Sequence, residues 1–159
     1  MHKAYIGIGT NIEPRLERMI TAVDALSDLG YIEKRSTIYR TPPFGYTDQP
    51  DFLNAVVLVG TDLEVGELHH RLKHLEKALG RVGRERWHER EIDFDILFFD
   101  DVVIRSTDLT VPHSEISKRP FVLIPLAEIA PDVIHPSLQK TVVDLLNELE
   151  YDKNSIHPI

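Results

Sequence analysis

The 159-residue sequence contains no cysteine. This absence excludes a disulfide framework, a zinc site built on thiolates and a cysteine nucleophile. Long hydrophobic runs are missing as well, and the opening residues MHKAYIGIG are too short and too mixed for a signal peptide or a membrane span. We therefore expect a protein of the reducing cytoplasm that has no contact with a membrane.

The sequence also lacks an excess of basic residues. Lysine and arginine number 18 against 26 aspartates and glutamates, which gives a formal net charge of −8. This balance argues against a nucleic-acid binder that relies on a broad basic surface. Neither of the two common phosphate-binding loops, G-x-x-x-x-G-K-[ST] or G-x-G-x-x-G, is present, so a bound nucleotide would be held by side chains.

Apolar periodicity predicts the order of the elements in the first two thirds of the chain. Strands are expected at 3–9, 31–40, 52–61 and 92–99, with helices between Pro14 and Gly30 and between Val65 and Leu79. This β-α-β-β-α-β order is the split βαβ, or ferredoxin-like, pattern of α+β proteins. It predicts a four-stranded antiparallel sheet with both helices on one face.

The last third predicts a C-terminal extension of short elements. We expect a short strand at 102–105, a loop at 109–113, and one or two short helical turns between 118 and 130, interrupted by Pro120 and Pro125. A final helix is expected at 141–149, followed by a loosely held tail from Tyr151. The length suits one domain over residues 1–159.

Two aspartates stand out in the strand at 92–99. Alternation predicts two faces, one with Ile92, Phe94, Ile96 and Phe98 and the other with Asp93, Asp95, Leu97 and Phe99. The Cα atoms of the aspartates would lie about 6–7 Å apart, and carboxylates that close repel each other unless a cation binds them. Mg²⁺ typically takes one or two carboxylates together with substrate phosphates. A solvated acidic face that binds nothing is the alternative.

Basic residues cluster just upstream of these aspartates. The arginines of this segment are Arg81, Arg84, Arg86 and Arg90, and it also holds the only tryptophan, Trp87. Arginine is well suited to phosphate, so the segment favours a compact anionic ligand. Because it has few apolar residues to anchor it, we expect this loop from Gly80 to Glu91 to be mobile and to close over bound phosphates.

Other candidate residues, taken singly, give weaker evidence of a functional role. Asn54 shares a strand face with Phe52, and its amide could bond neighbouring backbone or read the edge of a flat heterocycle stacked on Phe52, with the proline-rich segment 41–50 as a wall. His70 and His74 have the spacing of a two-histidine metal site, but no third ligand follows and a solvated helix face is the favoured interpretation. Glu76 is expected on the polar side of its helix.

Six sequence blocks, in order, carry a resemblance to a known family. They are I-G-T-N at 8–11, Y-R-T-P-P-F-G at 39–45, D-Q-P-D-F-L-N-A at 48–55, G-R-V at 80–82, R-W-x-x-R-x-I-D-x-D-I-L at 86–97 and L-T-V-P-H at 109–113. Each block alone is modest, but all six together are specific. From about residue 3 to about residue 145, the chain resembles the 6-hydroxymethyl-7,8-dihydropterin pyrophosphokinases of folate biosynthesis.

The resemblance implies an activity and a set of site residues. Members of this family transfer the β,γ-pyrophosphoryl group of ATP to the hydroxymethyl oxygen of the pterin, release AMP and use two Mg²⁺ ions. Asp93 and Asp95 would hold the metals and act in catalysis with Arg81 and Arg90. The pterin site would comprise Thr41, Pro42, Phe44, Phe52, Asn54, Trp87 and Phe121. The ATP site would comprise Glu76, Arg84, Trp87, Arg90, Ile96, Thr110, His113 and Arg119. Either Gly83 or Arg84 would take the place of the central arginine of the family's mobile loop.

Two rival interpretations come from other functional classes. A ferredoxin-like module that binds a ligand without catalysis would not need paired carboxylates next to an arginine-rich loop. A binder of single-stranded RNA would need a basic sheet with exposed aromatic residues, whereas this chain is acidic. The expected partners are therefore ATP and the hydroxymethyl pterin, without nucleic acid, and the expected state is a monomer.

Overall fold

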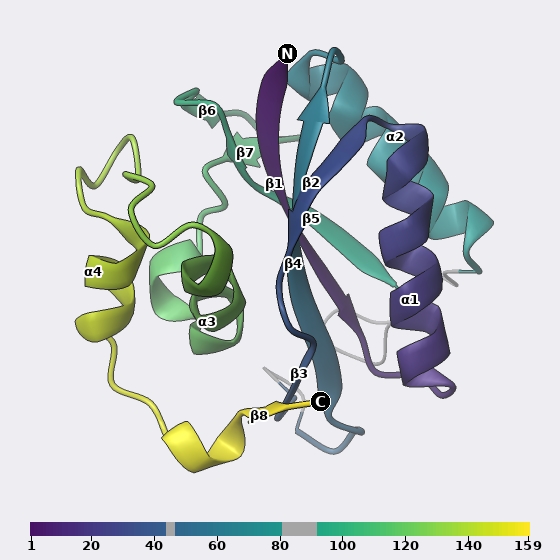
Figure 1. The fold of residues 1–159 in the computed structure, drawn as a ribbon, viewed down its shortest axis with the longest axis vertical. Helices are drawn as coiled ribbons and strands as arrows, with labels where there is room; N and C mark the ends of the chain where they lie inside the picture. Colours follow the sequence, from purple (N-terminus) through teal and green to yellow (C-terminus); the bar gives the residue numbers. More distant parts are fainter. Residues whose placement is uncertain (44–46, 81–91) are drawn as a thin grey trace.

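The computed structural model describes residues 1–43, 47–80 and 92–159, and an antiparallel sheet runs through its middle (Figure 1). Along the sheet the strands follow the order β5 (Asp93–Phe99), β1 (His2–Thr10), β4 (Phe52–Thr61), β3 (Tyr39–Thr41) and β8 (His157–Pro158). β2 (Tyr31–Arg35) pairs with β4 next to β3. Two long helices and this strand order confirm the α+β, ferredoxin-like fold that was predicted from the sequence.

One face of the sheet is covered by α1 (Arg15–Ala25) and α2 (Val65–Ala78), as predicted (Figure 1). A short 3₁₀ turn, η1 (Leu26–Asp28), extends α1. The core on this face is formed by apolar side chains from both helices and three strands, among them Met19, Leu26, Leu68, Leu72, Ile6, Ile8, Val57 and Phe94. Glycine is required at position 30, just after this helical region, because a Cβ there would lie 2.2 Å from the carbonyl oxygen of Gly60.

The other face is covered by the C-terminal part of the chain. It holds η2 (Ile116–Lys118), α3 (Pro120–Ile129) and α4 (Val142–Asn147), and a second core forms under them. The prediction of short, interrupted turns at 118–130 was wrong, because α3 is one helix of ten residues. Pro120 starts the helix, where its missing N–H costs no helical bond. Pro125 does cost one, and the burial of Leu123, Leu126 and Ile129 offsets it.

A β-bulge changes the faces of the strand that holds the aspartates. Ile96 lies opposite Ile6 and Phe98 lies opposite Tyr5, so Leu97 is an extra residue in β5. Phe98 therefore packs with Tyr5 in the α3 and α4 core, and Phe99 packs in the α1 and α2 core. The predicted faces of these two phenylalanines were wrong, while Asp93 and Asp95 share a face as expected.

Three further segments differ from the sequence predictions. The expected strand at 31–40 is divided into β2 and β3. Between them the backbone ladder with β4 is interrupted, because the N–H of Val56 donates to the Ser36 hydroxyl and not to a backbone carbonyl. The expected loop at 109–113 contains β7 (Thr110–Val111), which pairs with β6 (Ile104–Arg105). The expected loose tail forms η3 (Lys153–Ser155) and then β8, which pairs with β3.

None of the helices in the described ranges is long and apolar enough to cross a membrane.

Candidate active site

A cleft of about 500 Å³ opens between the sheet and the start of α3. Its floor comes from β1, β4 and β5, and its walls come from β3, the segment at 113–115 and α3. Nine of the residues predicted from the sequence line it: Thr41, Pro42, Phe52, Asn54, Asp93, Asp95, His113, Arg119 and Phe121. Residues far apart in the chain thus meet in one place, as the resemblance implied.

Two glycines of β1 keep the floor of the cleft open. Gly7 lies opposite Asp95, and Gly9 lies between Asp93 on one side and Asn54 on the other. A Cβ on Gly9 would lie 3.0 Å from Asn54 Oδ1 and would crowd the cleft. Sequence reasoning did not identify either glycine, although glycine at alternate positions of the strand, in I-G-I-G at 6–9, was the available signal.

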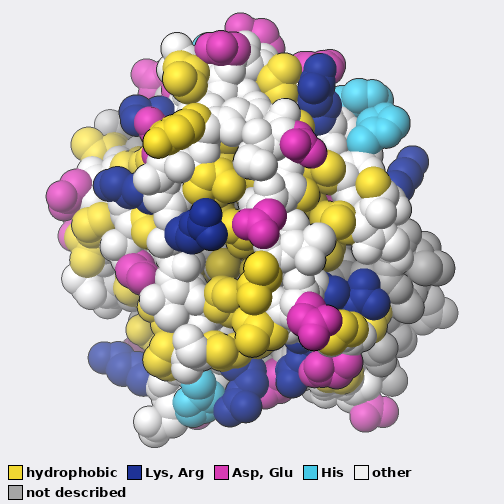
Figure 2. Space-filling model, turned by 45° about the vertical axis from the view of Figure 1, so that its right-hand side comes forward, with side chains coloured by type: hydrophobic (Ala, Val, Ile, Leu, Met, Phe, Trp, Pro, Cys, Tyr) yellow, Lys and Arg dark blue, Asp and Glu magenta, His cyan; other side chains and the backbone are white. Residues whose placement is uncertain are grey.

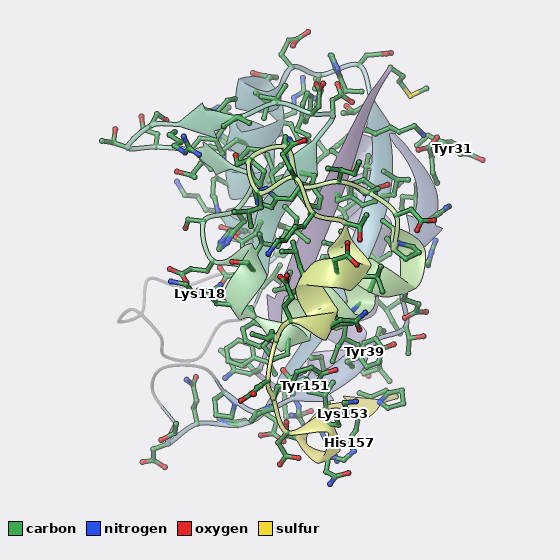
Figure 3. The ribbon with its side chains drawn as sticks, turned by 90° about the vertical axis from the view of Figure 1, so that its left-hand side faces the viewer. Tyr31, Tyr39, Lys118, Tyr151, Lys153 and His157 are labelled. Atoms are coloured by element: carbon green, nitrogen blue, oxygen red, sulfur yellow. The ribbon has the colours of Figure 1, made fainter. Side chains whose placement is uncertain are left out.

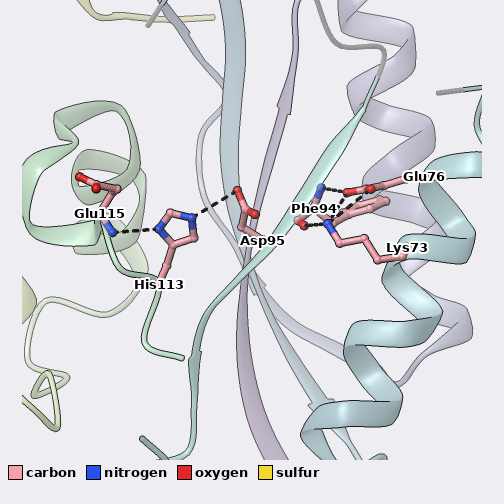
Figure 4. Close-up of polar contacts among 6 residues, drawn as sticks. All are labelled: Lys73, Glu76, Phe94, Asp95, His113 and Glu115. Atoms are coloured by element: carbon pink, nitrogen blue, oxygen red, sulfur yellow. Dashed lines mark hydrogen bonds and ion pairs between the residues drawn. The ribbon is translucent and has the colours of Figure 1, made fainter. Parts of the chain in front are cut away.

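The paired carboxylates of β5 point to the cleft side of the sheet. The Asp95 side chain is about half exposed (48%), and its Oδ2 lies 4.0 Å from His113 Nε2 (Figure 4). Among the described residues, no group of three or more His, Cys, Asp or Glu side chains could hold a metal. The cleft offers the two carboxylates of Asp93 and Asp95 next to open space, a donor set that fits Mg²⁺ with substrate phosphates.

His113 lies beside Asp95 and is a neutral hydrogen-bond donor. Its Nδ1 accepts the backbone N–H of Glu115 at 3.2 Å, so in the neutral ring the proton is on Nε2, which faces Asp95 (Figure 4). Burial lowers the pKa of His113 below its ordinary value, and the opposing effect of Asp95 is smaller. The His113 backbone N–H also donates to Leu97 O at 3.2 Å, which fixes the loop against β5.

The opposite end of the cleft combines an amide with two aromatic rings. Asn54 Nδ2 donates to Thr41 Oγ1 at 2.7 Å, which orients the amide within the cleft. Phe52 comes from β4 and Phe121 from α3, so rings from two layers line the same space. The guanidinium carbon of Arg119 lies 5.9 Å from the centre of the Phe121 ring. This end therefore suits a flat ligand with a polar edge.

The proline-rich segment beside this end is tied to the end of β1. The Asn11 side chain is fully buried, and its Nδ2 donates to Gln49 Oε1 at 2.8 Å and to Pro50 O at 3.1 Å. These bonds hold the end of the segment close to the strand that follows it, β4, whose first residue is Phe52.

Glu76 lies elsewhere than expected. It is not on the polar side of α2, because only 1% of the residue is exposed. Its Oε2 accepts the backbone N–H of Phe94 at 2.8 Å and the ammonium group of Lys73 at 3.2 Å (Figure 4). Lys73 also donates to Phe94 O at 3.4 Å. The pair thus binds the outer edge of β5 and holds the strand that carries the aspartates.

Two other predicted ATP-site residues also lie outside the cleft. The Ile96 side chain is buried in the α1 and α2 core. Thr110 lines a second cleft of about 650 Å³, which shares His113 and Ser114 with the first. The two clefts are therefore neighbours on either side of the 113–114 segment.

The remaining predicted site residues lie outside the described ranges. They are Phe44, Arg81, Arg84, Trp87 and Arg90. Their roles, the choice between Gly83 and Arg84, and the closing loop at 80–91 stay predictions from the sequence.

The chain is similar to known proteins of one family. The model of the 7,8-dihydro-6-hydroxymethylpterin-pyrophosphokinase family matches residues 5–131. A 2-amino-4-hydroxy-6-hydroxymethyldihydropteridine pyrophosphokinase of Aquifex aeolicus is 40% identical over 148 residues, which cover 93% of this chain and 92% of the relative. The enzyme of the same name from Methylorubrum extorquens is 43% identical over 136 residues, which cover 84% and 86%.

Solved structures show the same fold. The crystal structure of Plasmodium falciparum HPPK-DHPS with pteroate superposes with a TM-score of 0.76 at 18% identity and covers 92% of this chain. This chain spans only 42% of that longer protein. On the sequence matches, the chain belongs to the 7,8-dihydro-6-hydroxymethylpterin-pyrophosphokinase family.

Proposed function

We propose that this protein transfers pyrophosphate from ATP to the hydroxymethyl group of 6-hydroxymethyl-7,8-dihydropterin and releases AMP, as a step of folate biosynthesis. Family membership supports the reaction. The single observation that carries the proposal is the meeting of Asp93 and Asp95 with Asn54 and the two phenylalanines in one cleft. A metal-binding pair next to a slot for a flat heterocycle is what this transfer needs.

The pterin binds at the end of the cleft formed by β3, β4 and α3. Its ring stacks between Phe52 and Phe121, and Asn54 hydrogen-bonds its polar edge. Thr41 keeps the Asn54 amide in the orientation that this edge requires. A heterocycle held in this way is fixed before the reaction, which removes much of the entropic cost of bringing two substrates together.

The phosphates of ATP lie in the cleft over the aspartates and His113, which line it side by side. Asp93 and Asp95 would hold Mg²⁺, with two ions in our proposal, and Mg²⁺ held there would supply positive charge to offset that of the phosphate oxygens. The Nε2–H of neutral His113 and the guanidinium of Arg119 donate hydrogen bonds to the same group. Transfer then depends on positioning and charge stabilisation. His113 is a donor and not the base, because Nδ1 accepts from Glu115 and Nε2 carries the proton.

The nucleoside part of ATP extends past His113 towards the second cleft, where Thr110 is available. Because the Ile96 side chain is buried in the core, any contact from this residue comes from the backbone of β5. Glu76 contributes by holding β5 in place. Arg81, Arg84, Trp87 and Arg90 keep the roles expected from the sequence.

The proposal is tested by incubating the protein with ATP, Mg²⁺ and the hydroxymethyl pterin and identifying the nucleotide product by chromatography. We expect AMP. ADP would indicate an ordinary kinase, and tight binding of both substrates without turnover would support the alternative of a non-catalytic ligand-binding module. A nucleic-acid binder is disfavoured because acidic and basic side chains are interspersed over the described part of the face in Figure 2. One domain over 1–159, a monomer and a cytoplasmic location stay predictions.

A further inference from the structure

Near the end of α3, Glu128 fastens the helix to the strand segment that leads into β3. Its Oε2 accepts the Thr37 hydroxyl at 2.8 Å and the Thr37 backbone N–H at 3.0 Å. Its Oε1 accepts the Tyr39 hydroxyl at 2.8 Å. One carboxylate on the helix thus receives three donor groups from two residues of a single short segment.

The segment it holds is the interruption between β2 and β3. Ser36 still pairs with Val56, but Thr37 and Ile38 lie between the two ladders. A backbone N–H that leaves a ladder needs another acceptor, and for Thr37 this acceptor is Glu128. Glu128 thus supplies an acceptor that the interruption removes from the ladder.

The elements on either side of this contact carry opposite walls of the cleft. α3 bears Phe121, about two helical turns before Glu128. β3 bears Thr41, two residues after Tyr39 and therefore on the same face of the strand. A rigid tie between α3 and β3 therefore sets how far the Phe121 ring lies from the row formed by Phe52 and Asn54.

The C-terminal segment supports the same edge of the sheet from outside. Arg40 pairs with His157, and the Ile159 N–H donates to Ile38 O at 2.9 Å. Seen from the α3 and α4 side, Tyr39 lies between these helices and the segment that carries Lys153 and His157 (Figure 3). β3 is thus held by β4, by β8 and, through Glu128, by α3.

We infer that Glu128 is a positioning residue for the pterin, which it does not touch, because it fixes the width of the slot between α3 and the sheet. The inference rests on the proposed function. It predicts different effects on the two substrates, because the aspartates lie on β5, which β1 and β4 separate from β3. Loss of the Glu128 contact should widen the pterin slot and leave the phosphate end unchanged.

The test compares Glu128→Ala with Glu148→Ala, which removes another exposed carboxylate, one that pairs with Lys140. Dissociation constants for the pterin and for a Mg²⁺-bound, non-hydrolysable ATP analogue are measured by calorimetry. We expect Glu128→Ala to weaken pterin binding about tenfold, the size of effect seen when an orienting residue is lost. ATP-analogue affinity and kcat at saturating pterin should stay within about twofold of the parent.

Milder variants make the test independent of folding. Glu128→Gln keeps one acceptor oxygen and should restore most of the pterin affinity. Tyr39→Phe removes one of the hydrogen bonds and should weaken pterin binding slightly. In the double variant with Glu128→Ala it should cause no further loss of pterin affinity, because the two residues act through one contact.

Unchanged pterin affinity in Glu128→Ala would overturn the inference. Equal weakening of both ligands with a lower melting temperature would also overturn it, because Glu128 would then be a general scaffold residue. If the parent protein itself bound no pterin and formed no AMP, the proposed function would be wrong, and the inference about Glu128 would be wrong as a consequence.

Discussion

The hydrogen bond between Asn54 and Thr41 gives the sharpest test of the pterin end of the cleft. Thr41 is almost fully buried, and its hydroxyl accepts Asn54 Nδ2 at 2.7 Å. Thr41→Val keeps the shape of the side chain and removes only the acceptor. Asn54→Ala removes the amide itself, and Thr41→Ser keeps the hydroxyl and serves as the control.

The expected magnitudes follow from the number of contacts that each change removes. Asn54→Ala leaves one or two polar groups of the heterocycle edge unpaired in the cleft, at about 1–3 kcal/mol each, so pterin affinity should fall at least about fivefold, and about 30-fold for a total of about 2 kcal/mol. Thr41→Val leaves the amide present but no longer oriented, which should cost about 1 kcal/mol, or about fivefold in affinity. Thr41→Ser should stay within about twofold of the parent.

Calorimetry with the pterin and with the Mg²⁺-bound ATP analogue measures these effects separately. ATP-analogue binding should change little in all three variants, because Asn54 and Thr41 lie at the pterin end. Equal weakening of both ligands by Asn54→Ala would refute the assignment of Asn54 to the heterocycle. So would a loss of pterin affinity in Thr41→Ser as large as that in Thr41→Val.

Further predictions concern the metal site, β5 and the N-terminal histidine. Asp93→Asn or Asp95→Asn should lower turnover by orders of magnitude and leave the melting temperature without Mg²⁺ unchanged or higher, since like-charge repulsion is relieved; a clear drop in that melting temperature with turnover intact would make the pair structural. Glu76→Ala should instead lower the melting temperature, because a buried backbone N–H of β5 loses its acceptor at a cost of about 1–3 kcal/mol; an unchanged melting temperature would contradict this role. The hydrogen bond to Asp100 raises the pKa of His2. The stabilisation of the folded protein by His2 should therefore be complete below about pH 6.5 and disappear as the pH rises through the folded-state pKa. The difference in melting temperature between the parent and His2→Gln should shrink as the pH rises, and a difference that grows would contradict this role.

The sequence was sufficient for the parts of the site that depend on local pattern. Alternation in the strand at 92–99 predicts that Asp93 and Asp95 share a face, and they do. An amide in an apolar strand indicated that Asn54 needs a partner, and the structure supplies Thr41. The six resemblance blocks connected residues that periodicity alone could not connect, such as His113 with the β5 aspartates.

The parts that failed depend on tertiary contacts. The bulge at Leu97 moves Phe98 and Phe99 to the faces opposite to those predicted, and the residue type at this position does not predict a bulge. Glu76 looked like a surface residue because a buried carboxylate is recognisable only when its partner, here the N–H of Phe94, is known. The last residues were predicted to be loosely held because a two-residue strand has no sequence pattern of its own. The strand forms here by pairing with the edge of β3.

The most direct measurement of the central claim follows the β-phosphorus of ATP. The protein is incubated with Mg²⁺, the hydroxymethyl pterin and ATP labelled at the β-phosphate, and the label is located by mass spectrometry in the parent protein and in Asp95→Asn. We expect the parent to transfer the labelled phosphate to the pterin as part of a diphosphate and to leave unlabelled AMP, and we expect Asp95→Asn to lose this transfer. Label that stays on the nucleotide while a single phosphate reaches the pterin, or transfer that is unchanged in Asp95→Asn, would contradict it.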